Sequence, residues 1–351
     1  MVYLPDRYDH HVRLLPYVLS FVNDAIPSIR ESALDCIDRC GLQYECEHPE
    51  DVIERRQFGV DGDDIDYGSG LPESIPVRPS LGARLFVRSN ASRFFLALLG
   101  ELSSWKEHTR DRSAELLLIL TVYCEEALTK DFNRTVASIA KAIDVEMSSR
   151  SEDDPRSKLG QIRRVLRLMG KSVDPAVYLP LLRPRISGEY SERERRNYAM
   201  VLSSLIDGSP IQRLTLHWSD LATLLSGPDC IGPFVGTQTR RQCLTALRKL
   251  IAAVASEGRT EIFVSHHADA GELVKLRSVL ASSSETLKET APNNPGGDGD
   301  NAILVRGCID GLSEITAAIA KREGSTRPKT AIARSSSSTS SPPDPPPSEV
   351  P

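Results

Sequence analysis

The feature that most constrains this chain is a succession of amphipathic segments of helical period that come in pairs. Glycine and proline fall between these segments, and no stretch shows the sustained alternation typical of a strand. One pair cannot bury its own apolar face, but pairs repeated about every 40 residues can stack on their neighbours. The chain is therefore predicted to be an all-α solenoid of about six helical pairs. The expected pairs are 8–22 with 26–41, 83–103 with 107–127, 130–145 with 155–171, 174–186 with 191–207, 210–226 with 237–256, and 267–289 with 301–322.

Several of these helices have recognisable starts. Asp174 and Ser209 each precede a proline, whose missing N–H costs nothing at the first helical position. Ser191 is followed three residues later by Glu194, which is the spacing of a capping box. We expect all three polar side chains to cap the helices that follow them.

The first pair carries a signature of its own, and it resembles that of HEAT repeats. Its residues are Pro16, Asp24, Ile29, Arg30 and Ala33. In HEAT repeats the proline bends the first helix, the aspartate closes the turn, and an aliphatic residue and arginine open the second helix. Asp24 is expected to accept N–H bonds at the start of the second helix, and Arg30 to reach the aspartate position of an adjacent repeat. The spacing recurs without proline or aspartate at Leu96, Ser104, Thr109, Arg110 and Ser113 and is weak beyond; an irregular helical bundle is the alternative.

Composition divides the chain into four parts. We expect 1–44 to be the first HEAT-like helix pair, 45–82 an acidic loop rich in glycine and proline, 83–323 the HEAT-like solenoid, and 324–351 a disordered tail rich in serine and proline. Polar segments of this kind cannot bury enough apolar surface to order themselves. Residues 291–300 are expected to form a shorter flexible connection.

The overall composition argues against several classes of protein. A net charge of −5 and an aromatic content of 5% do not suggest a nucleic-acid binder. No apolar run approaches the roughly 18 residues that span a bilayer, and the start of the chain has no signal-peptide pattern. The seven cysteines are irregularly spaced, which suits reduced thiols in a cytoplasmic protein.

No motif predicts catalysis, a cofactor or a metal. Asp61, Asp63, Asp64 and Asp66 do not match the ligand spacing of an EF-hand, so a solvated acidic loop is preferred. Four further candidate ligands, Cys36, Cys40, Cys46 and His48, lack the spacing of a zinc site, and the first two share an apolar helix face. The chain is predicted not to be an enzyme, although a triad assembled in space cannot be read from sequence.

The helix expected at 155–171 carries a candidate docking strip. Leu159, Ile162, Val165, Leu166 and Met169 share one face, while the adjacent face is basic. The basic residues are Arg163, Arg164, Arg167 and Lys171, and no acidic residue lies between Arg156 and Lys171. A solvated helix flank is the preferred interpretation, and the functional alternative is a strip that docks an acidic partner surface.

The segment Arg78–Leu120 resembles the family of HEAT-repeat dynein axonemal assembly factors (HEAT repeat-containing protein 2 type). A loop ending in Arg-Pro-x-Leu-Gly leads into a helix, followed by Trp105, Thr109 and Arg110. Leu168–Leu182 resembles a second family segment, and the likeness covers about 9–250. The resemblance implies the C-terminal part of a non-enzymatic cytoplasmic scaffold that pre-assembles outer and inner dynein arms. Its implied partners are dynein intermediate chain and, further, other assembly factors or chaperones.

Two other functions stay open. A general HEAT scaffold, such as a phosphatase regulatory subunit or a nuclear transport receptor, would have more regular repeats. A hydrolase on an irregular helical fold would need a pocket where polar groups converge.

Overall fold

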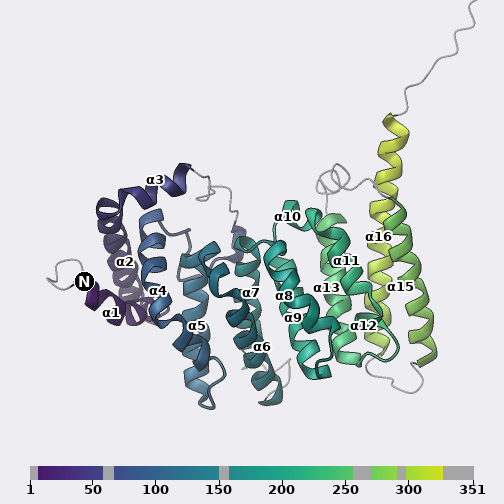
Figure 1. The fold of residues 1–351 in the computed structure, drawn as a ribbon, viewed down its shortest axis with the longest axis horizontal. Helices are drawn as coiled ribbons and strands as arrows, with labels where there is room; N and C mark the ends of the chain where they lie inside the picture. Colours follow the sequence, from purple (N-terminus) through teal and green to yellow (C-terminus); the bar gives the residue numbers. More distant parts are fainter. Residues whose placement is uncertain (1–6, 58–66, 150–157, 256–269, 291–297, 327–351) are drawn as a thin grey trace, which may run out of the picture.

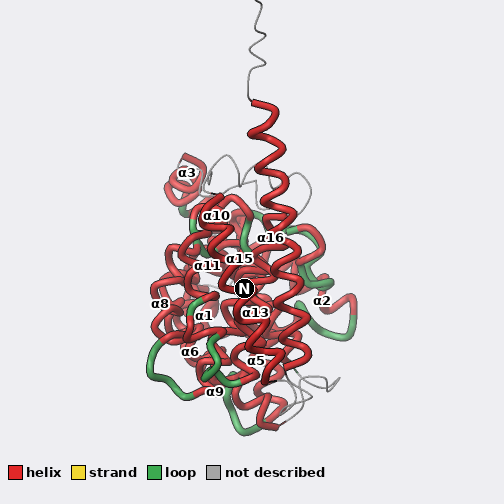
Figure 2. Tube along the Cα trace, turned by 90° about the vertical axis from the view of Figure 1, so that its right-hand side faces the viewer, coloured by secondary structure: helices red, strands yellow, loops and turns green. Residues whose placement is uncertain are grey.

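The structure is a computed structural model of the chain, and it describes residues 7–57, 67–149, 158–255, 270–290 and 298–326. Within these ranges every regular element is a helix (Figure 2). The helices stand side by side in sequence order along the long axis of the molecule (Figure 1). The predicted all-α solenoid is confirmed.

The helices form the expected pairs with bounds close to those predicted. The pairs are α1 (Arg7–Phe21) with α2 (Pro27–Glu47), α4 (Leu81–Glu101) with α5 (Glu107–Cys124), α6 (Phe132–Ser149) with α7 (Leu159–Ser172), α8 (Pro175–Ser187) with α9 (Glu192–Gly208), and α15 (Ala270–Thr290) with α16 (Asp298–Thr326). The helix expected at 210–226 is divided at His217 into α10 (Ile211–Leu216) and α11 (Trp218–Ser226), and α12 (Pro228–Ile231) precedes α13 (Thr237–Ala255). A short 3₁₀ segment, η2 (Glu125–Asp131), joins α5 to α6.

The second helices of successive pairs form a continuous row. Helices α5, α7, α9, α13 and α16 each pack on the next, and α4, α8, α11 and α15 pack against this row from their own pairs. One apolar core runs through the array from Leu15 to Ile319. Helix α9 is the most enclosed, since its residues from Asn197 to Ile206 are all buried. Within this row, α7, α9 and α13 carry the charged residues of the candidate interaction surface.

Two of the three expected caps are present. Asp174 Oδ1 accepts a hydrogen bond from Ala176 N at 2.8 Å. Ser191 and Glu194 form the predicted capping box at the start of α9. The expectation for Ser209 is wrong: its hydroxyl donates back to the Leu205 carbonyl, and Pro210 precedes α10 without a side-chain cap.

The first repeat shows how the signature residues act. Helix α1 continues through Pro16, and Ala33 is buried. Asp24 Oδ1 accepts from Ile26 N at 2.8 Å, as predicted. Arg30 Nη1 donates to the carbonyl of Asp24 at 2.8 Å and to that of Ala25 at 3.3 Å, so it closes the turn of its own repeat. The expectation that it reaches an adjacent repeat is wrong.

An arginine in the position of Arg30 recurs in later helix pairs, beyond the two pairs in which the sequence pattern was found. The fourth residue of α2, α5, α9 and α13 is an arginine, namely Arg30, Arg110, Arg195 and Arg240. Each donates to carbonyls of the segment before its own helix. Arg110 bonds Ser104 O at 2.9 Å, Arg195 bonds Ile186 O at 2.9 Å, and Arg240 bonds Gly232 O at 2.9 Å. The arginine therefore fixes the turn in these four pairs, whereas α7 and α16 carry Ile162 and Asn301 at the same position.

The prediction of one loop over 45–82 is wrong in part. Helix α2 extends to Glu47, and α3 (Pro49–Gln57) and a 3₁₀ turn, η1 (Gly68–Gly70), follow. Helix α3 is held because Val52 packs with Leu81 and Leu85 in a small apolar cluster. The aspartates at 61–66 lie outside the described residues. Helix α16 covers 298–300 and 324–326 of the segments expected to be flexible, and the rest of those segments, 291–297 and 327–351, is not described.

Candidate interaction surface

The four residues of the predicted basic strip lie on α7, but they face in two directions. Arg164 Nη2 donates to the Leu71 carbonyl at 2.6 Å. Lys171 Nζ lies 5.7 Å from the centroid of the Tyr67 ring. Both side chains therefore contact the residues that flank η1, and their role there is structural.

The other two arginines face α9. Arg167 Nε donates to Asp207 Oδ2 at 2.6 Å, and Arg163 Nη2 lies 4.0 Å from Met200 Sδ. A third cation reaches the same place from α13: Lys249 Nζ lies 3.4 Å from Asp207 Oδ2 and 3.5 Å from the Ser203 carbonyl. We call these three cations and Asp207 the α9 cluster. Sequence reasoning missed Lys249 because only the stacking of α13 on α9 brings it beside α7.

Burial and Asp207 have the largest influence on the pKa of Lys249 in the α9 cluster, ahead of the two arginines. Burial is the largest influence on Lys249 and lowers its pKa below the ordinary value. Asp207 opposes this effect, whereas the charges of Arg167 and Arg163 lower the pKa further. Asp207 is the carboxylate that two of the three cations share.

Close backbone packing fixes the α9 cluster. A side chain at Gly170 of α7 would overlap the Leu205 carbonyl of α9, and one at Gly208 of α9 would overlap the Arg167 carbonyl. Only glycine permits backbones to approach this closely. The two helices therefore meet at their C-terminal ends, where Arg167 faces Asp207.

A second charged group, which we call the Glu125 cluster, is buried at the start of η2. The Glu125 side chain is 1% exposed and accepts from Arg78 Nε, Arg84 Nη1 and Arg88 Nη2, each at 2.8 Å, and from Tyr67 Oη at 2.5 Å. Burial alone would raise the Glu125 pKa, but the hydrogen bond from Arg78, the charge of Arg84 and the bond from Tyr67 outweigh it, so the pKa is lowered. Glu125 has a φ of 47°, a rare conformation for a residue with a side chain. This cluster ties the loop before α4 to the end of α5.

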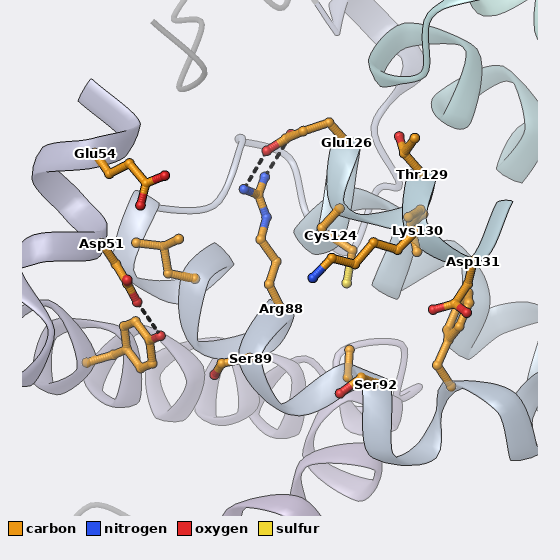
Figure 3. Close-up of a pocket in the computed structure, with 16 residues that line it drawn as sticks. Asp51, Glu54, Arg88, Ser89, Ser92, Cys124, Glu126, Thr129, Lys130 and Asp131 are labelled. Carbon is orange, nitrogen blue, oxygen red and sulfur yellow. Dashed lines mark hydrogen bonds and ion pairs between the residues drawn. The ribbon is translucent and has the colours of Figure 1, made fainter. Parts of the chain in front are cut away.

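A cavity of about 690 Å³ lies next to this cluster, between α3, α4 and η2 (Figure 3). Arg88 reaches across it to pair with Glu126, and Asp51 accepts from the Tyr44 hydroxyl at the opposite wall. Lys130 extends toward Arg88 and Cys124, on the side of Arg88 away from Asp51 in this view. The walls of the cavity carry charges of both signs, and no histidine is among the described residues that line it.

The remaining candidates from the sequence do not converge on a site. Cys40 is buried in α2, Cys36 is half-buried and Cys46 is exposed. Among the described residues, no group of three or more His, Cys, Asp or Glu side chains could hold a metal ion. Trp105 is 85% exposed at the turn between α4 and α5, so its indole contributes little to the core.

A family model supplies the decisive comparison. The model described as "Dynein axonemal assembly factor 5, HEAT-repeat domain" matches residues 71–265, more than half of the chain. The chain belongs to the dynein axonemal assembly factor 5 family. A further model of this family, described as TPR repeats, matches residues 1–55, which include α1 and α2. The resemblance predicted from Arg78–Leu120 and Leu168–Leu182 is thereby confirmed.

Relatives within this family are considerably longer than this chain. Dynein axonemal assembly factor 5 of Xenopus laevis is 25% identical over 279 residues, which cover 72% of this chain and 31% of the relative. The mouse and human proteins of the same name are each 28% identical over 226 residues, covering 64% of this chain and 24% of the relative. The chain thus spans a quarter to a third of the length of these family members.

No helix in the described part of the chain is both long enough and apolar enough to cross a membrane.

Proposed function

We propose that this chain is a non-enzymatic scaffold for the pre-assembly of outer and inner axonemal dynein arms. On this proposal it acts in the cytoplasm and binds dynein intermediate chain. The observation that carries the proposal is the family match over 71–265, which spans the stacked helices from α4 to α13. The relatives in this family are named for dynein axonemal assembly.

The architecture suits such a role physically. Partly assembled multi-subunit complexes expose unpaired interfaces that invite aggregation. A stack of helical pairs offers a long surface without needing a pocket for chemistry. A scaffold of this kind would cover subunit interfaces during assembly and leave before the arms are docked.

The test is deletion of the gene in a ciliated or flagellated cell. Electron microscopy should show axonemes whose microtubule doublets form but whose dynein arms are missing. A tagged copy should restore the arms and remain in the cytoplasm rather than along the axoneme. Normal arms and normal beating in the deletion strain would contradict the proposal and favour a general HEAT scaffold.

A second measurement addresses the partner. The tagged full chain should co-precipitate dynein intermediate chain from an extract of cells that are building cilia. Extract from cells that lack axonemal dyneins serves as the control. Recovery of phosphatase or transport-receptor subunits in place of dynein subunits would contradict the proposal.

A further inference from the structure

We draw no further inference here: the strongest candidate, the exposed aromatic side chains of Trp105 and Phe234 on the turns that lead into α5 and α13, is an apolar surface for which nothing in the structure shows what covers it.

Discussion

The Glu125 cluster and the α9 cluster each place cations around a shared carboxylate, three arginines in the first and Arg167 and Lys249 in the second. They differ in burial: the Glu125 side chain is 1% exposed, whereas that of Asp207 is 32% exposed. The Glu125 carboxylate accepts five hydrogen bonds, four from three arginines and one from a tyrosine. The α9 cluster has fewer and looser contacts, with Lys249 at 3.4 Å from the carboxylate.

Because they differ in burial, the two clusters contribute differently to the stability of the fold. Buried charges must satisfy each other, because removing one partner leaves the others desolvated and unpaired. Half-exposed charges contribute little to stability, because water and salt already screen them. The buried cluster therefore fixes the junction between the first two repeats, whereas the exposed one contributes little to the stability of the fold.

The largest expected effect comes from removing the two carboxylates separately. Glu125→Gln should lower the free energy of unfolding by about 3–5 kcal/mol, because it leaves three buried arginines without their shared anion. Asp207→Asn, the matched change in the exposed cluster, should cost less than about 1 kcal/mol. Urea unfolding followed by circular dichroism measures both. Equal losses would remove the distinction between the clusters.

The next effect tests whether backbone packing, rather than charge, holds the α9 cluster together. Gly170→Ala should destabilise by about 1–3 kcal/mol, because its methyl group would overlap the Leu205 carbonyl. Gly160→Ala is the control on the same helix, since no atom lies within 4 Å of the added carbon. It should be neutral or stabilise by up to about 1 kcal/mol. Thermal unfolding of the two variants measures both changes, and equal stability would show that the close packing of α7 on α9 is not required.

Helix pairing and most helix bounds follow from sequence, because apolar periodicity and turn residues are local. The expected helices 174–186 and 191–207 lie within about two residues of α8 and α9. Helix α3 was missed because its stability comes from Val52 packing on Leu81 and Leu85, which are distant in sequence and invisible to a local pattern.

The candidate surface was only half predictable for the same reason. Periodicity placed Arg163 and Arg167 on one side of a helix, but it could not tell that Arg164 binds the Leu71 carbonyl. Lys249 joins them only because α13 packs against α9. The recurring arginine at Arg195 and Arg240 could have been found from sequence by aligning the second helices at their starts.

The dependence of stability on pH gives a smaller effect, specific to the buried cluster. The pKa of Glu125 is lowered from its ordinary value of 4.5 in the folded chain. Its contribution is therefore complete above about pH 4.5 and is lost as the pH falls through the lowered folded pKa, by about 1.4 kcal/mol per unit of difference. Unfolding measured from neutral to acidic pH should show this loss in Asp207→Asn but not in Glu125→Gln. The same acid loss in both variants would contradict the role of Glu125.

The smallest effect on stability concerns Lys249 of the exposed cluster. Its pKa is lowered chiefly by burial, so the unfolded chain holds this proton more tightly than the folded one. Stability should thus rise as the pH increases from the lowered folded pKa toward 10.5, and the charge costs stability at neutral pH.

Lys249→Met keeps an unbranched apolar stem and removes the charge, so the free energy of unfolding should stay within about 1 kcal/mol of the original or rise. Urea unfolding followed by circular dichroism measures the change. A variant that loses several kcal/mol of stability would place Lys249 with the buried cluster, as a residue that holds the fold together.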